Sequence, residues 1–326
     1  MALSTRLTQF FNLEWPIVSA PMALASGGGL AREVTLGGGL GLIGGGYGDN
    51  SFINQAWEDA GNTKTGIGFI TWSLAKQEEL LELALQHSPA VVMLSFGDPT
   101  GFARQIKQTD TPLMCQCQSI NDVEIALDAG ADIIVAQGSE AGGHGARRGT
   151  LPFVPEAADL IARRNSRSLL LGAGGIADGR GIAASLLLGA DGVLVGSRYW
   201  ASQEALVARS FQQAAIAASG DDTLRTKIPD IARKLDWPAG FDIRILQNKL
   251  TQEYHSQLGD ASDRDLYQMS ERYINANQEE NAAEGGVIVG ESTGIINDLP
   301  GARDLTRRLG EQTEVALSAA GQFFLE

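Results

Sequence analysis

Positive charge is scarce in this sequence of 326 residues. It has 25 lysines and arginines against 39 aspartates and glutamates, which leaves a formal net charge of −14. Nucleic acids and anionic membranes are bound mainly through basic surfaces. The charge balance therefore disfavours both as the main partner. It stays compatible with a small anionic ligand that is held by backbone N–H groups.

Long apolar stretches are also missing. No run of about 18 residues, the length at which a transmembrane helix becomes a candidate, is free of polar interruption. The first residues, MALSTRLTQFFNLEWP, contain neither the charged nor the apolar block of a secretory signal peptide. We therefore expect a cytoplasmic protein that does not enter a membrane.

Cysteine is rare, with only Cys115 and Cys117 in the whole chain. Two thiols cannot complete a tetrahedral metal site, and positions i and i+2 of one strand have poor geometry for a disulfide. We expect both cysteines to be reduced residues of the protein interior, and we expect no metal site.

Short apolar runs are present in a regular series. Amphipathic stretches separate them, and their near-continuous hydrophobicity is typical of parallel strands that are buried on both faces. Eight such strands with intervening helices predict a (β/α)₈ TIM barrel. The runs are residues 16–21, 39–45, 66–72, 90–97, 111–117, 131–138, 168–175 and 191–197.

The segments between and after these runs read as helices. Ser119 and Asp178 have the residue type of an N-cap, and they open predicted helices at 119–130 and 178–190. Residues 203–285 show helical segments but no clear buried strand, which predicts an all-helical insertion after strand eight. The barrel then comprises 1–202 and 286–326, and its last helix begins after Pro300 and Gly301.

Glycine is abundant, at 40 residues, and it gathers where the predicted strands end. In a barrel of this type the site lies at the carboxyl ends of the strands, and phosphate is often held after strands seven and eight. The loops GAGG and VGSR follow those two strands and place Gly174, Gly175, Gly196 and Ser197 there. We favour a phosphate site over the alternative that these glycines only make tight turns.

One loop combines five glycines with a histidine: AQGSEAGGHGARRG, residues 136–149. A histidine between glycines at the catalytic face has little packing reason to be there, so we expect His144 to be functional. The other two histidines, His87 and His255, fall at predicted helix ends or surfaces. Glu140 either orients His144, pairs with Arg147 or is a solvated loop acid. Arg147 and Arg148 either attract an anionic substrate or are solvated charges.

Several motifs together resemble the nitronate monooxygenase family. They are PIVSAPM, GGLGLIGGGYG, AQGSEAGGH, GAGGIADGRGIAASLLLGADGVLVGSR and GESTGIINDLP. The resemblance covers residues of about 10–200 and 287–315, and it implies an FMN-dependent TIM barrel that acts on a small molecule. The same superfamily includes flavin-dependent enoyl-acyl-carrier-protein reductases and NAD(P)H:quinone reductases.

The resemblance also implies roles for individual residues. His144 matches the catalytic histidine of the family. Ile70 departs from the pattern, because many members have asparagine at that position. The positions implied in FMN binding are Ala20, Pro21, Met22, Gln116, Gln137, Gly142, Gly143, Gly174, Gly175, Gly196 and Ser197.

Three functions follow as hypotheses. The first is oxidation of alkyl nitronates by O₂ to a carbonyl compound and nitrite, with FMN bound and His144 beside it. The second is an NAD(P)H-dependent flavin reductase of quinones or enoyl thioesters. The third is a flavin-binding protein without turnover. In the first two, we expect residues 203–285 to cap the substrate pocket. The sequence leaves open whether the protein forms oligomers.

Overall fold

The computed structural model describes residues 3–319 and 322. Eight parallel strands form a sheet in the order β1-β9-β8-β6-β5-β4-β3-β2, and a bridge between Val18 and Leu40 brings its two edge strands together into a barrel. Each strand lies inside one of the eight apolar runs except β2, which extends one residue further, so the predicted TIM barrel is confirmed. The strands are β1 (Ile17–Ser19), β2 (Leu42–Gly46), β3 (Gly66–Ile70), β4 (Val92–Ser95), β5 (Leu113–Cys117), β6 (Ile133–Gln137), β8 (Leu169–Ala173) and β9 (Gly192–Val195).

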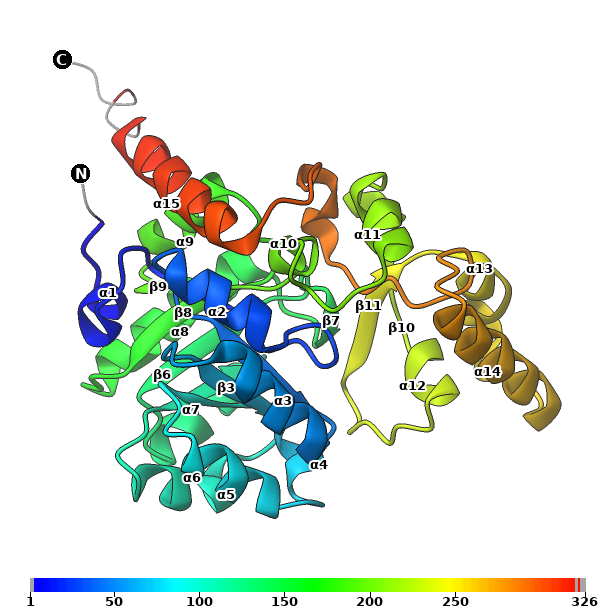
Figure 1. The fold of residues 1–326 in the computed structure, drawn as a ribbon, viewed down its shortest axis with the longest axis horizontal. Helices are drawn as coiled ribbons and strands as arrows, with labels where there is room; N and C mark the ends of the chain where they lie inside the picture. The colour runs from blue at the N-terminus through cyan, green and yellow to red at the C-terminus, as the bar shows by residue number, and fades with distance from the viewer. Residues whose placement is uncertain (1–2, 320–321, 323–326) are drawn as a thin grey trace.

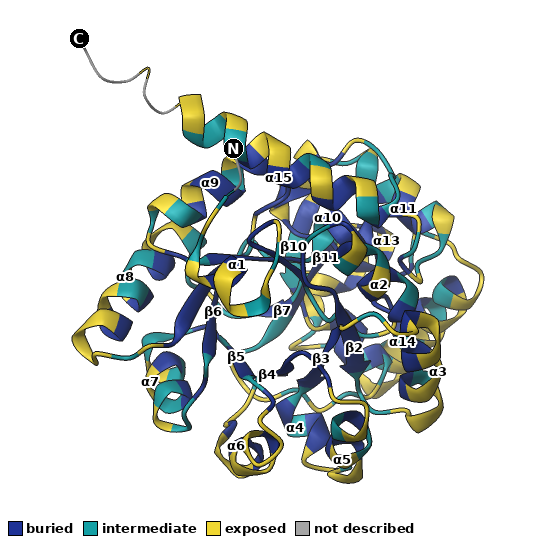
Figure 2. Ribbon diagram, turned by 60° about the vertical axis from the view of Figure 1, so that its left-hand side comes forward, coloured by how far each residue is buried: buried dark blue, intermediate teal, exposed yellow. Residues whose placement is uncertain are grey.

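Helices cover the outside of the barrel, and Figure 2 shows the strands buried beneath them. The helix α7 begins after the N-cap Ser119, and α9 begins after Asp178, as expected from the sequence. The barrel helices are α1 (Arg6–Phe11), α2 (Gly28–Leu36), α3 (Asn50–Ala60), α4 (Thr71–Leu74), α5 (Glu79–Gln86), α6 (Thr100–Lys107), α7 (Ile120–Asp128), α8 (Thr150–Arg163), α9 (Gly179–Leu187) and α15 (Ala302–Ala319).

Alternate strand residues pack into two different hydrophobic cores, because side chains alternate between the faces of a strand. Met93, Met114 and Leu171 lie in a core made of strand residues, which Leu7 of α1 joins. Leu94 and Ile134 lie in the core shared with the helices. With its middle filled by side chains, the barrel presents a site only at its ends.

The segment after β9 differs from the all-helical insertion that the sequence suggested. It contains helices, but two of its segments are strands, and Figure 1 shows this unit beside the barrel. Its elements are α10 (Ser197–Trp200), α11 (Arg209–Ile216), η1 (Gly220–Asp222), β10 (Thr223–Thr226), α12 (Ile228–Ala232), β11 (Asp242–Leu246), α13 (Lys249–Tyr254), η2 (His255–Gln257) and α14 (Asp263–Gln278), followed by η3 (Glu291–Ile295).

The three central residues of β11 are buried and its two end residues only partly so. Ile243 and Ile245 are buried, whereas Asp242 is partly exposed. β11 pairs antiparallel with β10 on one side and with β7 (Gly143–Gly145) on the other. Ile243 stands directly opposite His144 in this ladder. The insertion is therefore joined by backbone pairing to the loop that carries His144.

No helix among the described residues is long and apolar enough to cross a membrane.

Candidate active site

One cavity lies at the carboxyl ends of the strands, and it brings together the residues that the sequence singled out. All of them line it: His144, Ala20, Pro21, Met22, Gln116, Gln137, Gly142, Gly143, Gly174, Gly175, Gly196 and Ser197. Arg233, Trp237 and Ile243 of the insertion line the same cavity, as does Ile70 at the end of β3. Most of the remaining wall is apolar, so the few polar groups stand out.

The glycine loops after β8 and β9 present unused donors. Gly174 and Gly175 have φ angles of +101° and +71°, which residues other than glycine rarely adopt. A Cβ on Gly174 would lie 2.8 Å from the Thr150 hydroxyl and 2.9 Å from the Gly138 carbonyl oxygen. The backbone N–H groups of Gly174, Gly175, Gly196 and Ser197 donate to no other described residue. This is the arrangement that binds a phosphate through the main chain.

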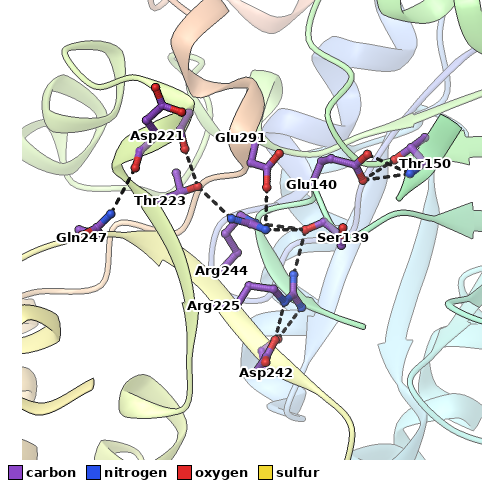
Figure 3. Close-up of polar contacts among 11 residues, drawn as sticks. Ser139, Glu140, Thr150, Asp221, Thr223, Arg225, Asp242, Arg244, Gln247 and Glu291 are labelled. Atoms are coloured by element: carbon purple, nitrogen blue, oxygen red, sulfur yellow. Dashed lines mark hydrogen bonds and ion pairs between the residues drawn. The ribbon is translucent and has the colours of Figure 1, made fainter. Parts of the chain in front are cut away.

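Two arginines of the insertion hold the β6–β7 loop in place (Figure 3). Arg225 and Arg244 are paired across β10 and β11, and both donate to the carbonyl oxygen of Ser139 at 3.1 Å. Arg225 forms an ion pair with Asp242. Arg244 forms an ion pair with Glu291, with 2.8 Å between Nη2 and Oε1. Without such contacts, a glycine-rich loop would sample many backbone conformations. These contacts fix its start on the way to His144.

Glu140 has a different role from the ones that the sequence suggested. Its carboxylate accepts from the backbone N–H of Thr150 at 2.9 and 3.0 Å and from the Thr150 hydroxyl at 2.8 Å. Thr150 is the first residue of α8, whose N-cap Gly149 has no side chain to fill that place. Glu140 therefore caps α8, and it contacts neither His144 nor Arg147.

His144 is buried and held by a carboxylate from the insertion. Its Nε2 lies 2.9 Å from Oδ1 and 3.0 Å from Oδ2 of Asp230, whose own exposed fraction is 4%. The indole of Trp237 stacks on the imidazole with 3.4 Å between ring centroids and 8° between planes. The Phe96 ring lies edge-on to the imidazole, with 6.2 Å between ring centroids. One face of the ring is thus covered, while the residue still lines the cavity.

The surroundings keep His144 neutral near pH 7. Burial lowers the pKa of His144 below its ordinary value, and the positive charges of Arg233 and Arg225 act in the same direction. The hydrogen bond and the charge of Asp230 oppose this shift without cancelling it. An imidazole that is neutral at physiological pH is able to accept a proton.

A row of glutamines supports the loop from the barrel side. Gln116 and Gln118 each donate from Nε2 to Oε1 of Gln137, at 3.2 and 3.0 Å. Gln137 in turn donates to the backbone carbonyl of His144 at 3.2 Å. This chain of amides links β5 and β6 to the backbone of His144.

The other candidates lie away from the cavity. His87 is exposed and stacks on Trp57, and His255 is exposed in η2. Arg148 pairs with Glu156, and Arg147 is exposed. None of these four residues lines the cavity, so the structure supports the reading of them as surface residues.

Sequence reasoning missed the residues that the insertion contributes. Asp230, Arg233 and Trp237 lie in a segment without a motif, and Asp230 is 86 positions from its partner His144. Tyr47 was missed as well, although it follows the glycines at the end of β2 and accepts a 3.2 Å hydrogen bond from the Trp237 indole. The one available signal was Trp237 itself, one of only five tryptophans in the chain and outside the predicted barrel strands.

Comparison with known proteins connects this site to a family. The model of the nitronate monooxygenase family matches residues 53–312. A nitronate monooxygenase of Metarhizium robertsii is 31% identical, with 93% of this chain and 92% of that protein covered. The chain belongs to the nitronate monooxygenase family. Members of the nitronate monooxygenase family are enzymes of the oxidoreductase class, so this protein is an enzyme of that class.

Solved structures with the same architecture have different names. FabK from Thermotoga maritima has a TM-score of 0.85 at 26% identity and covers 99% of this chain and 100% of its own. A nitroalkane oxidase from Streptomyces ansochromogenes has a TM-score of 0.78 at 22% identity, over 96% of this chain and 99% of its own. The second likeness concerns the fold alone. The barrel and its insertion are therefore shared with solved proteins that carry other names.

Proposed function

We propose that this protein oxidises alkyl nitronates with O₂ to a carbonyl compound and nitrite, with FMN bound in the cavity. One observation carries the proposal. A buried imidazole that is neutral near pH 7 and two loops with free backbone N–H groups face the same largely apolar cavity. A neutral imidazole can accept a proton from a carbon acid, and loops with free backbone N–H groups can bind the phosphate of a cofactor.

The residues present fit FMN. Gly174, Gly175, Gly196 and Ser197 would hold its phosphate, because their backbone N–H groups donate to no other described residue. The ring would lie against the other lining residues expected from the sequence, namely Ala20, Pro21, Met22, Gln116, Gln137, Gly142 and Gly143. When bound, FMN supplies the electron transfer that side chains of this kind do not perform.

His144 handles the proton in this proposal. Because Nε2 faces a carboxylate, Nε2 carries the hydrogen and Nδ1 keeps its lone pair. Nδ1 hydrogen-bonds to no described residue, so it is available to accept the proton next to the nitro group of a neutral nitroalkane. A nitronate that has already lost this proton needs no base. After taking the proton of a nitroalkane, by contrast, the ring would donate a hydrogen bond from Nδ1 to the oxygen of the nitronate that forms.

The insertion contributes the wall on the side of His144. Trp237 and Ile243 add apolar surface there, which supports the proposal that residues 203–285 cap the substrate pocket and exclude water. Ile70 adds a further apolar group where many relatives are expected to have asparagine. We therefore expect no polar contact with the substrate from position 70, and we expect His144 to contact the reacting carbon and nitro group.

Anaerobic mixing tests the function. Protein loaded with FMN is mixed without oxygen with an alkyl nitronate, with NADH or with NADPH, and the flavin absorbance is followed. We expect the nitronate alone to reduce the flavin, and air then to give nitrite and the carbonyl compound. Reduction by NADH or NADPH but not by nitronate would favour the reductase hypothesis. No reduction by any of them would favour a flavin-binding protein without turnover.

A further inference from the structure

Asp230 is the only carboxylate that touches His144 among the described residues, and it comes from a different part of the fold. His144 lies on β7, whereas Asp230 lies on α12 of the insertion. Both Asp230 oxygens are within 3.0 Å of Nε2, and the side chains are 8% and 6% exposed. A buried carboxylate is costly unless it is paired, so this contact constrains both residues.

The pairing fixes which ring nitrogen carries the hydrogen. An ionised carboxylate only accepts hydrogen bonds, so the neutral imidazole must place its hydrogen on Nε2. Nδ1 then keeps its lone pair. Without the carboxylate, nothing among the described residues would select this tautomer, because Nδ1 has no hydrogen-bond partner there.

Arg233 holds Asp230 in turn. Its Nη2 lies 3.2 Å from Oδ1 of Asp230, and its Nε donates to the carbonyl of Pro229 at 3.0 Å. The guanidinium also lies over the ring of Tyr47, 5.6 Å from the centroid. The carboxylate is thus clamped between the imidazole and the guanidinium, and its orientation does not depend on solvent.

We propose that Asp230 is a positioning residue for His144, which holds the hydrogen on Nε2 and so directs the lone pair of Nδ1 into the cavity. The expected effect on reaction rate rests on the proposed function. Which ring nitrogen of His144 carries the hydrogen does not depend on any reaction. Asp230 does not line the cavity, and it contacts none of the positions expected to bind FMN. Of the two cavity-lining residues that it bonds, His144 and Arg233, the proposal concerns His144.

If Asp230 had only a structural role, it would hold the insertion against the barrel. Other contacts already do this, because β11 pairs with β7 and both Arg225 and Arg244 bind Ser139. Loss of a tether would loosen the fold and change all substrates alike. Loss of a positioning group would instead change the protonation of one histidine and the rate on substrates that must lose a proton.

The charged groups around His144 set the expected pH response. Asp230 lies at Nε2, Arg233 follows it at the end of α12, and Arg225 approaches from β10. Of these three groups, only Asp230 favours the protonated ring. Replacing its charge in Asp230→Asn should therefore move the titration of His144 to lower pH. It should also make His144 a weaker base.

The first measurement is the nuclear magnetic resonance spectrum of protein containing isotope-labelled histidine. The chain has three histidines, and His87 and His255 are exposed. At neutral pH we expect His144 to show hydrogen on Nε2 and none on Nδ1. Hydrogen on Nδ1 in the unaltered protein would overturn the proposal without any variant and without any assay of activity.

The second measurement compares Asp230→Asn with Asp236→Asn. The control removes the same charge from an exposed residue six positions along the chain. We expect Asp230→Asn to lower kcat on a neutral nitroalkane by about tenfold or more, with little change in KM, and to move the acid limb of its pH profile to lower pH. Asp236→Asn should leave the acid limb in place. Asp230→Glu, which keeps the charge, should recover part of the rate.

The outcomes separate the two proposals. An unmoved His144 titration in a folded Asp230→Asn protein, or an equal loss on nitroalkane and preformed nitronate, would overturn the positioning role. Absence of nitrite release from the unaltered protein would refute the proposed function instead. The tautomer measurement would then still decide whether Asp230 positions His144.

Discussion

Replacing Gly175 by aspartate should weaken the binding of FMN through charge. Gly175 is exposed in the loop after β8, and its backbone N–H is one of the four unused donors. A carboxylate and a phosphate about 5 Å apart repel by roughly 2–3 kcal/mol per unit charge at an effective dielectric constant of about 20–30. We therefore expect the Kd for FMN to rise by about 30- to 150-fold.

The matched control is Gly175→Asn, which has nearly the same shape without the charge. Both substitutions have the same backbone strain at a φ of +71° and the same approach of Cβ to Glu140 Cβ, at 3.2 Å. Fluorescence titration of the flavin-free protein with FMN gives both Kd values. Added salt should narrow the gap between them, because it screens exposed charges. Equal Kd values for the two variants at low salt would refute a phosphate site at this loop.

Three further predictions concern other parts of the structure. Cys115 and Cys117 should not react with a thiol reagent in the native protein and should react after unfolding, because burial raises the pKa of the Cys115 thiol to about 12 and that of Cys117 well above its ordinary value. Trp237→Ala should expose His144 and relieve the burial that lowers its pKa, so the acid limb of the pH–rate profile should move to higher pH; an unmoved limb would argue against burial as the cause. Glu140→Ala should lower the free energy of unfolding in urea by about 1–2 kcal/mol, since it removes the cap of α8, and an unchanged midpoint would contradict that role.

The barrel could be predicted because each of its strands is buried on both sides. Met93 and Leu94 face different cores, yet both environments are apolar, so a continuous apolar run marks the strand. β10 and β11 gave no such signal. The sequence DIRIL interrupts its apolar residues with Asp242 and Arg244, and its pairing partner GHG is short and rich in glycine.

The side of the site formed by the barrel could be predicted for a related reason. Gly174 and Gly175 have conformations that favour glycine, so their residue type reveals their geometry. Asp230 left no comparable mark, because an aspartate in a polar segment is usually solvated and only the folded chain brings it to His144. Glu140 illustrates the same difficulty, because it is close to His144 in sequence but does not contact it in the fold. The acid next to a candidate histidine in sequence caps a helix, and the acid beside that histidine in space lies in the insertion.

The role of His144 in the chemical step is tested most directly by nitrite release from His144→Asn and the unaltered protein, each supplied with a neutral nitroalkane and with its preformed nitronate. Flavin content serves as the control, and it should be equal in both proteins. We expect a loss of about 10²-fold or more on the nitroalkane and a much smaller loss on the nitronate, because only the nitroalkane needs a base. Equal rates for the two proteins on both substrates would remove His144 from the mechanism.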